Sequence, residues 1–286
     1  MRELNLIDFQ YLYYKYKLVI ESGRLSYVSA HGRDVTKLFY PLREIEGFTQ
    51  KGKIDTVICF DSAKNERKAK DNDYKRDRKK RLNYQDIENI NNLRDMLSLM
   101  GYCVLKEDGK EADDLIAYAL NKLKDEYDCI NIYTVDFDLL QLVQPKVKVH
   151  LYRMRHSYTI VDMHNFQEVA TELFKTYIDY NMIMVYKSLV GDNSDNIKGI
   201  QGFGITAYKK WFDKNKETIA CEYCNQRDYV EQLIMNNFEG ERLEQALDAL
   251  DKVAFHIDDI DCEIVFNQTQ ERRERVYLEY EMRGLI

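Results

Sequence analysis

Short apolar runs that lead directly to an acidic residue are the most regular pattern along this chain. Three such runs, and a fourth that leads into the turn at residues 110–114, are rich in β-branched or apolar residues and therefore predict strands. The predicted strands are Leu4 to Ile7, Thr56 to Phe60, Tyr102 to Leu105 and Ile130 to Val135. Apolar residues at helical spacing predict helices over Ile87 to Met100 and over Leu115 to Leu123. This alternation of strand and helix predicts an α/β fold with a mostly parallel central sheet and flanking helices.

Beyond about residue 160 the strand pattern fades and helical spacing replaces it. Helices are expected over Tyr180 to Leu189, Thr206 to Lys214 and Leu243 to Ala254. The stretch of highest glycine density, residues 191–204, joins the first two of these helices. We therefore expect an α/β core over residues 1–160 and a helical lobe over residues 161–286.

Length and composition indicate a globular protein. The chain has 286 residues, of which 45% are hydrophobic, so it is long enough for one large core or two smaller ones. No apolar stretch suits a signal peptide or a membrane span, so we expect a cytoplasmic protein without a membrane partner. Cys221 and Cys224 have metal-like spacing, but no second pair completes a zinc site, and a structural role is favoured.

Nine carboxylates form five clusters, most of them beside a predicted strand: Asp8; Asp61; Glu111, Asp113 and Asp114; Asp136 and Asp138; Asp192 and Asp195. Parallel strands bring their carboxyl ends to one edge of a sheet, and hard cations such as Mg²⁺ hold converging carboxylates together. Such a site activates water against a phosphodiester. Two other interpretations stay open: Asp113 and Asp114 also suit the first turn of a helix, and Asp136 and Asp138 also resemble the nucleophile loop of small phosphatases.

Two segments carry the features of nucleic-acid contacts. Residues 64–81 contain ten Lys or Arg against four acids, although the whole chain carries a net charge of −7. Within this run Tyr74 offers a stacking face for an unpaired base, and the alternative is an ordinary solvated helix face. The second segment is a glycine hairpin with flanking lysines that suits a duplex backbone: Lys198, Gly199, Gly202, Gly204, Lys209 and Lys210.

Five ordered motifs carry a family resemblance. They are Phe60-Asp61 with Arg67; Tyr74-Lys75-x-x-Arg78; Gly109-Lys-Glu111-Ala-Asp113-Asp114; Thr134-Val-Asp136-Phe-Asp138; and Gly191-Asp192-Asn-Ser-Asp195 with its hairpin. Together they resemble the bacteriophage 5′-nucleases (flap endonucleases) and the 5′-nuclease domain of bacterial DNA polymerase I. The resemblance covers residues 3 to about 215.

The resemblance implies a PIN-like core, a helical arch at about residues 62–100 and a helix-three-turn-helix module in the lobe. It implies that the nine carboxylates bind two or more Mg²⁺ ions, for which Mn²⁺ substitutes, and that a K⁺ ion sits on the hairpin. Lys75 and Arg78 would contact the scissile phosphate, while Arg67, Tyr74 and Lys15 would bind nucleic acid. Lys15 replaces a family arginine and Phe9 replaces a glycine, which narrows the approach to Asp8.

The expected function is therefore hydrolysis of DNA or RNA phosphodiesters at junctions between a 5′ single strand and a duplex, and at 5′ ends. We expect a monomer that removes RNA primers or flaps during phage replication in the host cytoplasm. A single-strand binding protein or a replisome component is a candidate partner. The competing interpretations are a small-molecule phosphatase built on Asp136 and Asp138, and a non-enzymatic clamp that binds structured DNA.

Overall fold

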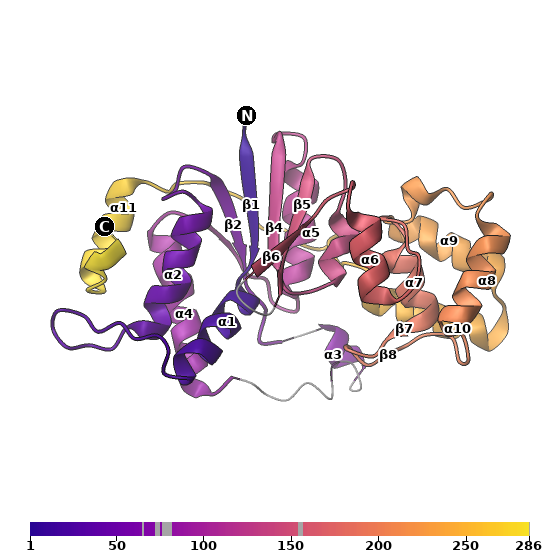
Figure 1. Cartoon of the computed structure of the whole chain (residues 1–286), viewed down its shortest axis with the longest axis horizontal. Helices are drawn as coiled ribbons and strands as arrows, with labels where there is room; N and C mark the ends of the chain where they lie inside the picture. The colour runs from indigo at the N-terminus through magenta and orange to yellow at the C-terminus, as the bar shows by residue number, and fades with distance from the viewer. Residues whose placement is uncertain (65, 72–74, 76–81, 154–156, 286) are drawn as a thin grey trace. The chain divides into compact units, whose positions relative to one another are not determined.

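The computed structural model describes residues 1–64, 66–71, 75, 82–153 and 157–285. The chain forms two compact units and passes between them several times (Figure 1). The first unit comprises Met1–Lys64, Lys80–Val135 and Ile257–Ile286, and the second comprises Asn65–Lys79 and Asp136–His256.

The first unit is built on four parallel strands. Their order is β3 (Cys103–Leu105), β2 (Asp55–Cys59), β1 (Glu3–Asp8) and β4 (Cys129–Thr134). Leu6 of β1 lies opposite Val57 on one side and Ile132 on the other, and all three side chains are fully buried. Nearly continuous burial along β1 and β4 is typical of parallel strands that are covered on both faces. The predicted parallel strands are confirmed.

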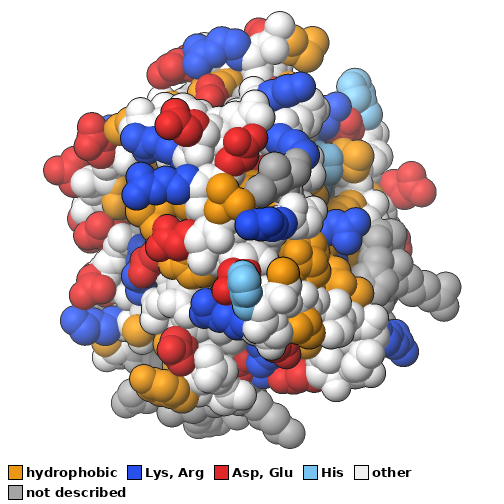
Figure 2. All heavy atoms as spheres, turned by 90° about the vertical axis from the view of Figure 1, so that its left-hand side faces the viewer, with side chains coloured by type: hydrophobic (Ala, Val, Ile, Leu, Met, Phe, Trp, Pro, Cys, Tyr) orange, Lys and Arg blue, Asp and Glu red, His pale blue; other side chains and the backbone are white. Residues whose placement is uncertain are grey.

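Helices cover these strands (Figure 1). They are α1 (Phe9–Glu21), α2 (Thr36–Phe48), α4 (Tyr84–Leu99), α5 (Ala112–Leu123) and α11 (Gln270–Glu279), with a final 3₁₀ turn, η3, at Arg283–Leu285. Helix α5 packs on β1 and β2, while α2 packs against both α1 and α4. Figure 2 shows a face on which positive and negative side chains alternate, so no field of one sign dominates there.

A buried carboxylate ties three helices of this unit together. Asp86 on α4 is 0% exposed, and its oxygens accept hydrogen bonds from Lys17 Nζ of α1 at 2.5 Å, Lys37 Nζ of α2 at 3.0 Å and Tyr13 OH at 3.1 Å. Burial alone would raise the pKa of Asp86, but these donors and the amide of Asn83 outweigh burial and hold it well below its usual value.

We expect Asp86→Ala to lower the free energy of unfolding by about 3–5 kcal/mol at pH 7, because it removes the buried acceptor of Lys17, Lys37 and Tyr13 and leaves Lys17 only the half-exposed Glu21 carboxylate. Urea unfolding measures this change, and Asp95→Ala, on the exposed face of α4, is the control. The folded-state pKa of Asp86 lies below the unfolded one, so its contribution is complete above about pH 4 and is lost only in stronger acid. Equal losses in the two variants would contradict a special role for Asp86.

The second unit combines a strand pair with a group of helices. Strands β5 (Val147–Arg153) and β6 (Ser157–Val161) are antiparallel. The other elements are α3 (Glu66–Lys70), η1 (Asp138–Leu142), α6 (Phe166–Phe174), α7 (Ile183–Val190), β7 (Gly191–Asp192), β8 (Ile197–Lys198), α8 (Ile205–Asn215), η2 (Cys221–Tyr223), α9 (Arg227–Asn237) and α10 (Gly240–Val253). The buried helix α7 packs against α8, α10 and η1 and forms the centre of this unit.

The division of the chain differs from the expected boundary at residue 160. The second unit already begins at Asp136 in this part of the chain, and residues 257–286 return to the first unit. There, Asn267 N donates to Gly101 O at 3.0 Å, and Tyr118 OH donates to Cys262 O at 2.9 Å. Helical periodicity shows that a segment buries one face, but it cannot show which core that face joins. Among the described residues, no helix has both the length and the apolar character needed to cross a bilayer.

Candidate functional site

Asp8 stands at the junction of β1 and α1, where a strand end becomes a helix start. Its Oδ1 accepts a hydrogen bond from Gln10 N at 3.1 Å, which caps α1. Its Oδ2 accepts one from Thr134 Oγ1 at 3.0 Å, at the end of the neighbouring strand β4. These two bonds fix the orientation of a carboxylate that is only 6% exposed.

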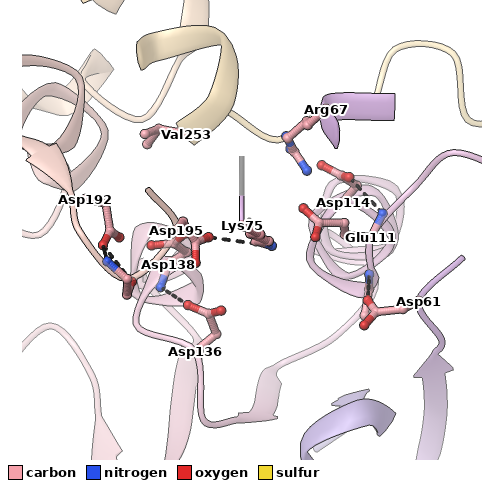
Figure 3. A network of polar contacts seen from close by, with 12 residues as sticks. Asp61, Arg67, Lys75, Glu111, Asp114, Asp136, Asp138, Asp192, Asp195 and Val253 are labelled. Carbon is pink, nitrogen blue, oxygen red and sulfur yellow. Dashed lines mark hydrogen bonds and ion pairs between the residues drawn. The ribbon is translucent and has the colours of Figure 1, made fainter. Parts of the chain in front are cut away.

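The N-terminus of α5 gathers further carboxylates of the first unit. Asp61, just beyond β2, accepts a hydrogen bond from Ala112 N at 2.9 Å, and Asp114 accepts one from Glu111 N at 3.1 Å (Figure 3). Asp114 and Glu111 form a capping box, which accounts for the burial of Asp114 at 1% exposure. Asp114 therefore has the capping role that its position suggested, and the positive end of the helix favours the carboxylates gathered there.

The second unit holds a separate acidic cluster around one buried lysine. Lys187 on α7 is 4% exposed, and its ammonium group contacts both Asp138 and Asp192, the latter at 2.5 Å. Asp136 Oδ1 accepts a hydrogen bond from the backbone amide of Asp138 at 2.9 Å. Burial would raise the pKa of Asp192, but Lys187 and Ser194 outweigh burial and lower it.

Lys75 belongs to the same unit and binds the loop between β7 and β8. Its amide donates to Asp195 O at 2.9 Å, and its Nζ lies 3.5 Å from Asp195 Oδ2 (Figure 3). The Lys75 backbone has a φ of 51°, in the left-handed region. The structure thus brings Lys75 of the basic segment next to a predicted metal-binding carboxylate.

Two other residues predicted to bind nucleic acid, Lys15 and Arg67, make contacts within the protein. Lys15 Nζ lies 2.6 Å from both carboxylate oxygens of Glu44, and Arg67 donates to Ala254 O at 2.8 Å. Both side chains are largely buried, so these contacts hold helices and backbone together. Tyr74 and Arg78 lie outside the described residues. Sequence reasoning missed Lys187, whose only signal is a lysine in an otherwise apolar helix.

The glycines of the hairpin differ in their surroundings: Gly199 is closely packed, whereas Gly202 and Gly204 are open. A Cβ on Gly199 would lie 2.4 Å from Gly191 N and 2.5 Å from Leu189 O, so close backbone packing requires glycine there. Gly202 has a φ of +73°, and a Cβ on Gly202 or Gly204 would meet nothing within 4 Å. The open glycines precede α8, where Lys209 and Lys210 are exposed.

We expect Gly199→Ala to lower the thermal midpoint of unfolding by several degrees, because the added methyl group pushes the hairpin away from the end of α7. Gly204→Ala should leave the midpoint nearly unchanged, since its surroundings are open and its φ is −85°. Differential scanning calorimetry compares the two variants. If both variants melt alike, the close contact between Gly199 and Gly191 does not determine the stability of the hairpin.

The carboxylate oxygens of these clusters are suitable ligands for hard cations, but their arrangement in the structure is less suitable. Carboxylate oxygens are the ligands that Mg²⁺ prefers. Within the part of the chain that the structure describes, however, no three Asp, Glu, His or Cys side chains are grouped so that they could hold a metal ion. Lys187 and Lys75 occupy positions beside the acidic side chains of the second unit, so there the positive charge comes from ammonium groups.

Comparison with known proteins identifies the family. The model of the 5′-3′ exonuclease, N-terminal resolvase-like domain, matches residues 3–171, which is more than half of the chain. The chain belongs to this family. It is similar to DNA polymerase I of Caldicellulosiruptor bescii, with 31% identity over 169 residues, or 58% of this chain and 19% of that protein. It is also similar to the 5′-3′ exonuclease of Mycoplasma genitalium, with 38% identity over 112 residues, or 39% of this chain and 37% of that protein.

Each of these two matches spans less than half of the curated relative's length. The chain is also similar to the flap endonuclease of Escherichia phage T5, with 29% identity over 125 residues, which are 44% of this chain and 38% of that protein. The solved T5 D15 protein, co-crystallised with metal ions, has a TM-score of 0.61 at 18% identity and covers 89% of this chain and 90% of its own. At this identity the likeness shows a shared fold, and the α/β fold class is confirmed.

Proposed function

We propose that this protein is a metal-dependent, structure-specific 5′-nuclease. It hydrolyses phosphodiesters at 5′ ends and at junctions between a 5′ single strand and a duplex. The observation that carries this proposal is the position of Asp8 and Asp61 at the carboxyl ends of parallel strands β1 and β2 in a member of the 5′-3′ exonuclease family. Ligands bind beyond the carboxyl ends of strands in sheets of this kind.

The proposed metal ligands are the nine carboxylates of both units. In the first unit they are Asp8, Asp61, Glu111, Asp113 and Asp114, and in the second they are Asp136, Asp138, Asp192 and Asp195. Bound Mg²⁺ or Mn²⁺ would supply an activated water and would stabilise the departing oxygen of the phosphodiester. Relatives support metal dependence, since the T5 5′-exonuclease has been solved with bound zinc.

Two lysines of the second unit, Lys187 and Lys75, would supply positive charge beside the proposed metal ligands. Lys187 holds Asp138 and Asp192 in place, and a metal ion bound by these carboxylates would compete with its ammonium group for their oxygens. Lys75, held beside Asp195, is proposed to neutralise charge that develops on the phosphoryl oxygens. Arg78 is proposed to share this role on the strength of the family motif alone.

Duplex nucleic acid is proposed to bind the second unit, at the glycine hairpin and α8. Lys198, Lys209 and Lys210 are exposed around the open end of the glycine hairpin, where backbone amides and ammonium groups can contact phosphates. The catalytic core of Rad2 in complex with DNA substrate has the same fold, with a TM-score of 0.53 at 17% identity over 100% of this chain and 93% of its own. RNA primers and flaps fit the same backbone-directed recognition.

We expect both Asp61→Asn and Asp138→Asn to reduce cleavage of a labelled 5′-flap duplex in Mg²⁺ by at least about 10²-fold, because each removes a charged oxygen ligand. Flap binding in Ca²⁺ should remain or become tighter, since each change also removes repulsion of phosphates. Single-turnover cleavage and fluorescence anisotropy measure the two quantities. Asp125→Asn, an exposed change in the first unit, is the control.

Retention of near wild-type cleavage by both variants would overturn the metal assignment. Equal loss in Asp125→Asn would indicate a general effect of acidic charge and not a metal site. Loss of flap binding together with cleavage would indicate that the two carboxylates support the fold, and thermal unfolding of each variant checks that outcome.

We expect the double change Lys209→Ala and Lys210→Ala to weaken binding to every duplex-containing substrate and to reduce the salt slope of log Kd by about one to two units. The reason is that each exposed ammonium group releases counterions from a phosphate. Lys122→Ala with Lys124→Ala, two exposed lysines of the first unit, is the matched control. If the first double variant lost affinity only for single strands, these lysines would belong to a single-strand path.

A further inference from the structure

A cavity of about 730 Å³ lies in the second unit beside α8, away from the acidic side chains described above. Three aromatic side chains line it: Tyr177, Tyr208 and Phe212. The ring centroid of Phe212 is 6.2 Å from those of both Tyr177 and Tyr208. A cavity of this volume is within the range of small-ligand sites.

Tyr177 is the aromatic side chain that a ligand reaches first. It lies in the loop that follows α6 and is 50% exposed, whereas Tyr208 is only 1% exposed. Burial, together with the nearby Asp179 carboxylate, raises the pKa of Tyr177. A half-exposed ring that packs against Phe212 provides a stacking face at low entropic cost.

Charges of both signs surround the aromatic side chains. Lys209 and Lys216 contribute ammonium groups, and Asp179, Asp213 and Glu217 contribute carboxylates. Ammonium groups suit a phosphate, carboxylate oxygens accept hydrogen bonds from the amino groups of a base, and aromatic faces stack on the base itself. The two lysines disfavour a purely cationic ligand, for which an aromatic and acidic pocket would otherwise be suitable.

We propose that this cavity binds one unpaired nucleotide of the nucleic acid that the protein holds, with its base stacked on Tyr177 and Phe212. Lys209 of α8 both lines the cavity and belongs to the surface proposed to contact phosphates, so a strand bound there would reach the cavity. This inference rests on the proposed function, because it takes nucleic acid as the ligand. It adds a contact to the base itself, whereas the hairpin lysines contact only the backbone.

The test compares two probes that differ only in their bases. One is a short fluorescein-labelled oligodeoxythymidylate, and the other is an abasic oligodeoxynucleotide of the same length. Tyr177→Ala should weaken binding of the first probe by at least about fivefold, the low end of the loss when one base loses its aromatic partner. Binding of the abasic probe should be unchanged. Phe212→Leu should act in the same direction, and Tyr177→Phe, which keeps the ring, should bind like the wild type.

Tyr223→Ala is the matched control, because Tyr223 is 45% exposed in the same unit and does not line the cavity. Circular dichroism verifies the fold of each variant. Equal weakening of both probes by Tyr177→Ala, or no weakening of either, would overturn the proposal. Mg²⁺-dependent flap cleavage is measured separately: its absence in the wild-type protein with intact probe binding would refute the nuclease function and not the cavity.

Discussion

The dominant constraint on this protein is the cost of concentrating carboxylates where water is scarce. A buried charge that loses its partner costs several kcal/mol, so every buried acid needs a donor or a cation. At the strand ends of the first unit, amides meet this need: Asp8 and Glu111 are the N-caps of α1 and α5, and Asp8, Asp61 and Asp114 accept bonds from backbone NH groups. The second unit meets it with ammonium groups, above all that of Lys187.

Amide and ammonium partners have different consequences for metal binding. Amides at a helix start stay in place when a cation arrives, whereas an ammonium group competes with the cation for the same oxygens. We therefore expect the carboxylates at the strand ends of the first unit to keep their amide contacts if a metal ion binds, whereas a metal ion at Asp138 and Asp192 would compete with Lys187.

The sequence predicted the parallel strands and the acidic residues at their ends because both depend on local pattern. Strand β1 was expected over Leu4 to Ile7 and lies at Glu3–Asp8. Lys187 could not be predicted in the same way, because its partner Asp138 is 49 residues away and only the fold brings them together. The hairpin gave a mixed outcome: Gly202 and Gly204 are open, as close approach of a phosphate requires, but Gly199 is needed for its contact with Gly191.

The first unit is discontinuous in sequence, and residues 257–286 return to it after the longest segment of the second unit. Asn267 bonds to Gly101, and Arg273 lies 3.4 Å from the buried Glu46, so contacts that complete the first unit come from its most distant residues. During synthesis on the ribosome the second unit can fold as soon as its own residues emerge, whereas the first must wait for residues 257–286. The acidic strand ends therefore reach their finished surroundings only after the whole second unit has been synthesised.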